Sequence, residues 1–423
     1  MSGRSIHHHL AEARRATLAG KPEQAQQHLE AAVAIDSTEP TARNLLGADA
    51  LARGDARSAA EHFESACGRE PGEPTHWLNL ATAHRALGEA AAERAALEAV
   101  LAIDQADLLA LIRLAELHEQ QGEATQAEDR WRAVAVLSSG ITDPSPDFAK
   151  IVDHAKHYVR ERQKKLADAI DGSLANDLSN ATTRDFRRMR AAADAWLGRR
   201  PIYANQCEGL HYPFLPADEY FDREHFPWLA DLEAATGVIA AELKSILDDQ
   251  RSELTPYIAL PPGTPANKWS PLDKSLDWGA FHLWKEGVRH DEACARAPLT
   301  AALVDSLPMC RIEGRAPNIF FSILKAGGHI PAHTGVTNVR GVVHLPLVVP
   351  EGCAFRVGGE IREWRTGEAF AFDDTIEHEA WNRSSEDRAV LILDVWNPHL
   401  SDHERSMICR LYQSADETRG TIR

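Results

Sequence analysis

The chain lacks any long hydrophobic run. No stretch of 18 apolar residues occurs among its 423 residues, so no transmembrane helix and no membrane insertion are expected. The N-terminal sequence MSGRSIHHHLAEARR also has no apolar core of the kind that a signal peptide requires. The sequence therefore predicts a protein that does not enter the secretory route.

Cysteine and positive charge are scarce as well. The six cysteines are scattered and form no CxxC pair, which argues against a disulfide framework or a zinc knuckle. Reduced thiols favour a cytoplasmic location. Lys and Arg together number 46 against 63 Asp and Glu, a net charge of −17, so the chain has no surplus of cations for phosphates. No nucleic-acid partner is expected.

The first third of the chain contains a repeat. Four glycines recur at a spacing of 34 residues: Gly20, Gly54, Gly88 and Gly122. Two apolar columns keep the same register: Leu29, Phe63, Leu97 and Trp131 in one, and Leu46, Leu80 and Leu114 in the other. A period of 34 with Ala-rich helices and a turn glycine resembles the tetratricopeptide repeat. Each unit would be a helix pair that buries its apolar stripe by stacking on its neighbours.

We assign residues 1–140 to this tetratricopeptide domain. Such arrays bind a peptide or a partner protein on their concave face, and a spacer or a dimerisation element is the alternative. His84 and His118 also share the repeat register, and we expect them to be surface residues lining the repeats. Residues 141–200 have helical spacing and mixed charges, which predicts a helical linker of one or two helices.

Residues 201–423 differ in composition, with more Pro, Gly and aromatic residues and short strand-like runs. The candidate strands are APNIFFSIL, GVVHLPLVV, CAFRVGG, IREWRT, EAFAFDD and AVLILDVW. Their spacing of roughly ten residues, with Gly and Pro between them, predicts an antiparallel double sheet or jelly roll. One helix is expected at 228–250. The chain as a whole is thus a multidomain α + β protein, a helical solenoid followed by a β domain.

Two histidines lie where apolar strand gives way to polar loop. His333 is in the segment 320–350, FFSILKAGGHIPAHTGVTNVRGVVHLPLVVP, and His378 is in the segment 370–381, FAFDDTIEHEAW. Two imidazoles delivered from separate strands suit a transition-metal site in a barrel. A hydrogen-bonded structural histidine is the plainer interpretation of each one alone.

Five segments carry a resemblance to a known family. DWGAFHLWKEG, HTGVTN, the later His344, FDDTIEHEAW and RAVLILDVWNPHL resemble the aspartyl/asparaginyl β-hydroxylase family, and the resemblance covers residues 205–413. That family has a double-stranded β-helix fold and belongs to the oxygenases that depend on Fe(II) and 2-oxoglutarate and use O₂. In its animal members a helical repeat region precedes the catalytic domain, as the repeat does here.

The resemblance implies that His333 and His378 hold the iron. A third, carboxylate ligand would normally lie two residues after the first histidine, where this chain has Gly335. The family is known for holding iron with two histidines alone, so the absence agrees with it. Asp373 and Asp374 receive no ligand role.

Four residues are implied to hold 2-oxoglutarate. Arg388 and Ser322 would bind the distal carboxylate, since a guanidinium offers a planar fork for it and a hydroxyl adds a donor. His344 would contact the end of the co-substrate nearer the metal, and Trp278 would line the pocket.

Substrate recognition is implied to involve Arg340. The family has two arginines in this segment, and the second falls on Val342, which puts the family's acidic substrate in doubt. His329 also matches a family position, and we expect a structural role for it. No catalytic side chain is expected beyond the metal centre.

The resulting hypothesis is hydroxylation of a C–H bond, at the β-carbon of an Asp or Asn residue in a peptide or protein that the repeats help to present, with release of succinate and CO₂. One alternative keeps the chemistry and changes the substrate to a small molecule or a lipid acyl chain. The other alternative is a scaffold whose barrel has lost catalysis.

Overall fold

A computed structural model describes residues 2–180, 183–249 and 254–421. The chain divides into two compact units, Met1–Asn176 and Asp177–Arg423. The residues predicted to be a linker, 141–200, are therefore shared between the units. No helix in the described ranges is both long and apolar enough to cross a membrane.

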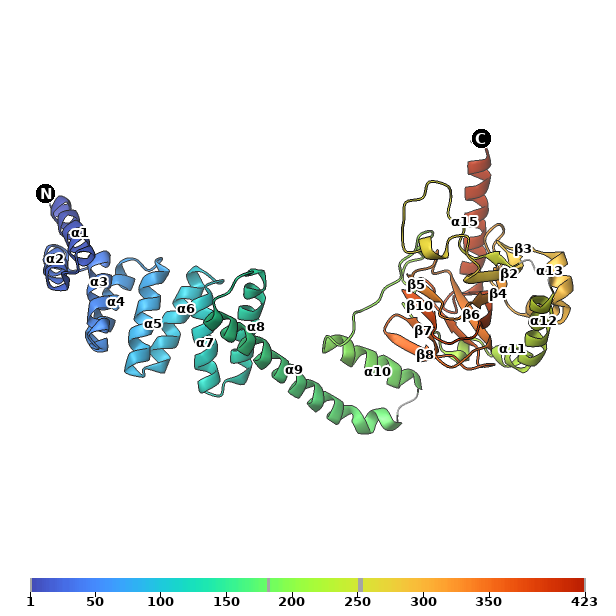
Figure 1. Ribbon diagram of the computed structural model, residues 1–423, viewed down its shortest axis with the longest axis horizontal. Coiled ribbons are helices and arrows are strands. Elements are labelled where there is room, and N and C mark those ends of the chain that lie inside the picture. Colours follow the sequence, from blue (N-terminus) through green and yellow to red (C-terminus); the bar gives the residue numbers. More distant parts are fainter. Residues whose placement is uncertain (1, 181–182, 250–253, 422–423) are drawn as a thin grey trace. The chain divides into compact units, whose positions relative to one another are not determined.

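The first unit is a succession of antiparallel helix pairs (Figure 1). The pairs are α1 (Ser2–Leu18) with α2 (Pro22–Ile35), α3 (Pro40–Ala52) with α4 (Ala56–Arg69), α5 (Pro74–Leu87) with α6 (Ala90–Ile103), and α7 (Leu108–Gln120) with α8 (Ala124–Leu137). The long helix α9 (Pro146–Asn180) follows and crosses the boundary between the units. The predicted helical repeat is confirmed.

The repeat register explains why these pairs form. All four turn glycines have positive φ, between 66° and 84°, which residues with a Cβ adopt at a cost. The two apolar columns are buried, and a Cβ at Gly47 would lie only 2.7 Å from the ring of Phe63, so the small residue lets two helices approach closely. The expectation for His84 and His118 was wrong, because both are buried.

Each of these two histidines lies against a carboxylate at the start of the next helix. His84 Nδ1 is 2.8 Å from Glu89 and His118 Nδ1 is 2.6 Å from Glu123. A buried imidazole is tolerated where such a polar partner exists. The two histidines therefore link the two helices within a repeat.

After the last residues of α9, the second unit continues with α10 (Thr183–Trp196) and contains two antiparallel sheets with helices at their periphery (Figure 1). Its helices are α11 (Leu229–Ala234), α12 (Thr236–Asp248), α13 (Asp291–Arg296), α14 (Pro298–Ser306) and α15 (Asp402–Thr421). Its strands are β1 (Thr255–Pro256), β2 (Trp278–Lys285), β3 (Val288–Arg289), β4 (Ile319–Leu324), β5 (His329–His333), β6 (Arg340–Val348), β7 (Cys353–Val357), β8 (Glu360–Glu363), β9 (Phe370–Phe372), β10 (His378–Asn382) and β11 (Arg388–Trp396). The helix expected at 228–250 is divided in two at Ala235.

The strands alternate between the sheets. The larger sheet has the order β1-β2-β4-β11-β6-β9, with β3 paired to β2, and the smaller one has the order β5-β10-β7-β8. From β4 onward the chain passes from one sheet to the other at nearly every step, which is compatible with the predicted jelly roll. The described strands pair in antiparallel fashion in every ladder.

Alternate side chains along the central strands face either the hydrophobic core or the candidate site. Along β11, Leu391 and Leu393 pack with helices α11, α12 and α14 in one cluster, whereas Val390 belongs to a second cluster built from strands of both sheets. Because neighbouring side chains of a strand point to opposite faces, β11 and β6 each present one residue set to the helices and the other to the space between the sheets. The candidate site lies in that space.

Candidate active site between the two sheets

All seven predicted site residues line one cavity of about 720 Å³ in the second unit. They are Trp278, Ser322, His333, Arg340, His344, His378 and Arg388. They come from six strands: β2, β4, β5, β6, β10 and β11. The fold therefore brings together side chains that are up to 110 positions apart in the sequence.

The two histidines are cross-strand partners. His333 ends β5, His378 begins β10, and the two residues pair in the antiparallel ladder with ring centroids 4.0 Å apart. Each Nδ1 lies within hydrogen-bond distance of the carbonyl oxygen two residues earlier, Pro331 at 2.8 Å and Ile376 at 2.9 Å. When Nδ1 carries the proton for that bond, the Nε2 lone pair remains free for a metal ion.

Burial keeps both imidazoles neutral. It lowers the pKa of His333 to about 4 and lowers the pKa of His378 well below its ordinary value. A metal ion binds the neutral imidazole, so both rings are in the ligating state at neutral pH without losing a proton. Among the described residues no group of three or more His, Cys, Asp or Glu side chains is placed to hold a metal, so any site here rests on fewer protein ligands.

Gly335 makes room for the carboxylate of Asp374, to which the sequence analysis gave no ligand role. Its N–H donates to the Asp374 carbonyl at 2.6 Å, and a Cβ on it would lie 2.1 Å from Asp374 Oδ2. Asp374 is buried in the wall of the cavity, and burial raises the pKa of its carboxyl to about 7 against the opposing effect of Arg340. The only signal in the sequence was its position four residues before His378.

The far end of the cavity holds a buried cation. Arg388 is 2% exposed, and none of the carboxylates in the described ranges pairs with it. Its Nη2 donates to Ser322 Oγ at 3.2 Å, and Trp278 Nε1 donates to the same oxygen at 3.1 Å. Its guanidinium also lies 4.4 Å from the ring centre of Trp364. Burial lowers the pKa of Arg388 to about 9, which shows how poorly this place tolerates a charge without a counter-ion.

His344 lies in an aromatic enclosure. The rings of Phe355, Trp364, Phe370 and Phe372 surround it at centroid distances of 5.0 to 5.6 Å. Burial, and then the charge of Arg388, lower its pKa well below the ordinary value, and its Nδ1 has no hydrogen-bond partner in the described part of the chain. A neutral imidazole with an unused nitrogen is suited to a polar ligand.

Arg340 is already paired. Its Nη1 lies 2.8 Å from Asp394 Oδ2, and its Nη2 lies 3.9 Å from Asp374 Oδ2. Val342 is buried between Arg340 and His344 on the same face of β6. At the end of the cavity opposite Arg388, an incoming acid would therefore meet Arg340, a cation that already has two carboxylates beside it. His329 lies outside the cavity lining, where it contacts Glu379 and stacks on Trp381.

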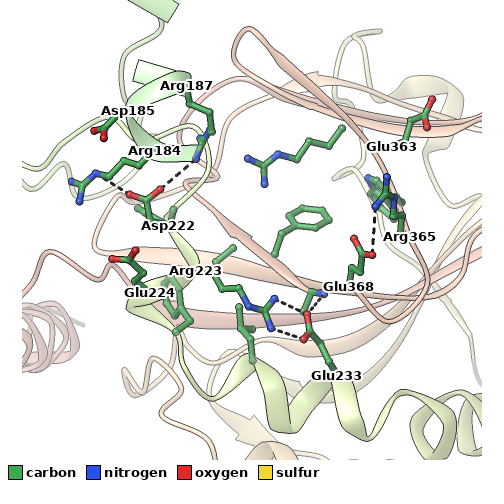
Figure 2. A pocket seen from close by; sticks show the side chains of 18 residues that line it. Arg184, Asp185, Arg187, Asp222, Arg223, Glu224, Glu233, Glu363, Arg365 and Glu368 are labelled. Carbon is green, nitrogen blue, oxygen red and sulfur yellow. Dashed lines mark hydrogen bonds and ion pairs between the residues drawn. The ribbon is translucent and has the colours of Figure 1, made fainter. Parts of the chain in front are cut away.

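A second cavity of about 880 Å³ lies where α10 and α11 meet the edge strand β9. Figure 2 shows Arg184 and Arg187 directed at Asp222, and Arg223 directed at Glu233. Its charges thus largely neutralise each other, and none of the predicted site residues lines it. We place the candidate active site in the cavity between the sheets.

The second unit is similar to known hydroxylases. The family model for aspartyl/asparaginyl beta-hydroxylase matches residues 233–398. The aspartyl/asparaginyl beta-hydroxylase of Homo sapiens is 41% identical over 141 residues, which are 32% of this chain and 18% of that protein. The aspartate beta-hydroxylase domain-containing protein 2 of Homo sapiens is 32% identical over 218 residues, covering 50% of this chain and 56% of that protein.

Two solved structures of tetratricopeptide repeat proteins are similar to part of the chain. A tetratricopeptide repeat protein from Parabacteroides merdae has 16% identity and a TM-score of 0.32, and the match covers 46% of this chain and 75% of that one. The thermophilic TPR protein TTC0263 from Thermus thermophilus has 17% identity and a TM-score of 0.29, covering 44% of this chain and 98% of that one.

A bacterial relative matches over more of its own length. The ornithine lipid ester-linked acyl 2-hydroxylase of Rhizobium tropici is 33% identical over 230 residues, which are 54% of this chain and 73% of that protein. The family model also spans the strands that carry both histidines, Ser322, His344 and Arg388. By this extent of similarity, the chain belongs to the aspartyl/asparaginyl β-hydroxylase family.

Proposed function

We propose that the chain is a hydroxylase that depends on Fe(II) and 2-oxoglutarate. The observation that carries the proposal is the joint presence, in one cavity, of two neutral histidines 4.0 Å apart and a buried guanidinium without a carboxylate partner among the described residues. The two histidines suit a transition-metal ion such as iron, and the guanidinium suits a carboxylate. A scaffold would gain nothing from keeping an unpaired charge buried.

The residues present fit both groups. His333 and His378 would hold the metal through Nε2, and Arg388 with Ser322 would hold the distal carboxylate of 2-oxoglutarate. His344, whose Nδ1 is unused, would face the part of the co-substrate nearer the metal, and Trp278 would fix Ser322 through its indole N–H. Iron, 2-oxoglutarate and O₂ would together supply the oxidation, in which a substrate C–H becomes C–OH while 2-oxoglutarate becomes succinate and CO₂.

The protein's own part is to bind, orient and exclude water. The aromatic rings around His344 and the apolar faces of both sheets keep bulk water from the reacting centre. The carbonyls of Pro331 and Ile376 fix the tautomers of the two histidines. No side chain is required to remove a proton from the substrate, and none is proposed.

Metal and co-substrate binding test this proposal. Anaerobic titration of the full chain with Fe(II) in the presence of 2-oxoglutarate should produce a weak visible charge-transfer band, and aerobic turnover should release succinate. His333→Ala and His378→Ala should each abolish the band, whereas the control His329→Ala, outside the cavity, should keep it. No band and no succinate from the wild type would favour the scaffold hypothesis.

For the substrate, we propose an Asp or Asn residue of a peptide or protein, presented with the help of the tetratricopeptide array in the cytoplasm. The names of the human relatives support the residue class. Six free cysteines support the compartment. The chain covers 18% of the human aspartyl/asparaginyl beta-hydroxylase, so this assignment extends beyond the compared part.

A lipid acyl chain or another small molecule is the second candidate. The pairing of Arg340 with Asp394, the apolar Val342 and the Rhizobium relative favour it. Incubation with peptide and lipid libraries should distinguish the two by which pool gains the mass of one oxygen atom. Val342→Arg should raise activity toward an acidic peptide if the peptide hypothesis is right, and should lower activity on an acyl chain if the lipid hypothesis is right.

A further inference from the structure

The two histidines of the site are supported by different parts of the fold. His378 is 6% exposed and packs against Phe355 and Phe372, with ring centroids 5.9 and 5.2 Å away. Phe355 belongs to the smaller sheet and Phe372 to the larger one. His333 is only partly buried, and its aromatic neighbours are Trp269 and Trp278. Trp269 belongs to neither sheet, so one of the two proposed ligands relies on a loop.

The strand that carries His333 has little support of its own. β5 is the edge strand of the smaller sheet, and its pairing with β10 shifts register between His378 and Ala380. An edge strand beside a bulge has hydrogen bonds on one side only and an interrupted ladder. The end of β5 therefore needs other contacts to keep the imidazole in a single orientation.

The loop between β1 and β2 supplies those contacts. Lys268 Nζ donates to the carbonyl of Ala332, the residue directly before His333, at 2.8 Å. The next residue, Trp269, places its indole edge-on to the His333 ring at 5.0 Å and 70°, and nearly parallel to Trp278 at 6.2 Å and 30°. Edge-to-face contacts at such distances are favourable and directional.

The loop is itself held in shape. Trp269 N–H donates to Asn267 Oδ1 at 2.8 Å, and Ser270 Oγ accepts from Asn267 N–H at 2.9 Å. At its base Lys274 N–H donates to the Ile258 carbonyl at 2.9 Å, and Asp273 accepts from Leu260 N–H at 2.7 Å. A loop with this many internal bonds can position a side chain instead of merely covering the cavity.

We propose that Trp269, assisted by Lys268, is a positioning residue that holds the imidazole of His333 in its metal-binding orientation. The inference rests on the proposed function, because it assumes that His333 binds a metal ion. Side chains that orient a ligating histidine typically change metal affinity on the order of tenfold or more when they are lost. Trp269 itself binds neither the metal nor the substrate in this proposal.

Titration of the whole 423-residue chain with Mn²⁺, followed by the EPR signal of the free ion, tests this without any turnover. Trp269→Ala should weaken Mn²⁺ binding on the order of tenfold. Trp269→Phe, which keeps an aromatic ring, should restore affinity to within about threefold of the wild type. Lys268→Met replaces an exposed side chain and should leave the core intact. It should show a smaller loss of Mn²⁺ affinity than Trp269→Ala.

The matched control is Trp196→Ala, a tryptophan that is 74% exposed on α10 and should leave affinity unchanged. Wild-type affinity in Trp269→Ala overturns the positioning role while leaving the proposed function intact. Failure of Trp269→Phe to recover affinity also overturns it, since the ring would then not be what matters. A wild type that binds no Mn²⁺ overturns this inference together with the proposed function.

Discussion

At the scale of single residues, burial favours the neutral form of four histidines that line the cavity. His282, His333, His344 and His378 all have pKa values lowered by burial. Each of them gains a proton more readily in the unfolded chain than in the folded one. Acid should therefore unfold this unit more easily than the net charge alone suggests.

His282 offers a clean measurement, because it lies in the cavity wall but has no role in the proposed metal site. Burial, with smaller effects of Lys285 and His290, lowers its pKa to about 4 from 6.5. Between these values the unfolded chain binds more protons, so stability falls as pH drops from 6.5 toward 4. His282→Gln should reduce the fall in melting midpoint between pH 7 and pH 5. His403→Gln, exposed on α15, should retain the wild-type fall, and an unchanged slope in His282→Gln would contradict the assignment.

At the scale of elements, the loop after β5 and the turn before β10 are fitted to each other through Gly335 and Asp374. Because a Cβ at position 335 would lie 2.1 Å from the Asp374 carboxylate, Gly335→Ala must displace one of these segments. We expect a loss of about 1–3 kcal/mol in the free energy of unfolding, as overpacked sites typically show.

Urea denaturation measures that loss. Gly237→Ala in α12 is the control, because its Cβ would meet no atom within 4 Å and alanine favours a helix. The control should be neutral or more stable than the wild type. Equal stability of Gly335→Ala and wild type would mean that the two segments are not packed as described.

The elements also show what the sequence could predict. The apolar runs that became β4, β6, β7, β9 and β11 were recognisable because they alternate or are buried throughout. β5 and β10 were not separated as strands, since their five residues each include His and, in β5, a proline. Their pairing is set by contacts across the sheet, which local sequence does not contain.

The residues of the candidate site could be predicted, but most of the contacts between them could not. Motif resemblance identified the seven residues, and the structure brings them into one cavity, but their metal and co-substrate roles remain predictions. The ion pair of Arg340 with Asp394 could not be predicted, because 54 residues separate them and the register of β6 and β11 decides the contact. The contact of Trp269 with the His333 ring could not be predicted for a similar reason, because its loop precedes every recognised motif of the second unit and is far from His333 in the sequence.

At the scale of the whole molecule, each unit has its own interior. Of the six hydrophobic clusters among the described residues, three lie in Met1–Asn176 and three in Asp177–Arg423. Such units can unfold separately. Calorimetry should therefore show two transitions. Gly47→Val, which crowds the ring of Phe63, should lower one of them and leave the other unchanged. A single transition that shifts as a whole would show that the units unfold together.

The buried guanidinium of Arg388 has a consequence for the whole unit. Its charge has no counter-ion within the described chain, so the folded state without ligand retains an uncompensated buried charge, which the proposed dicarboxylate ligand would neutralise. Binding of that anion stabilises the fold in proportion to the logarithm of its concentration. If that anion is 2-oxoglutarate, as proposed, this unit should resist unfolding and proteolysis most strongly when the proposed co-substrate is abundant.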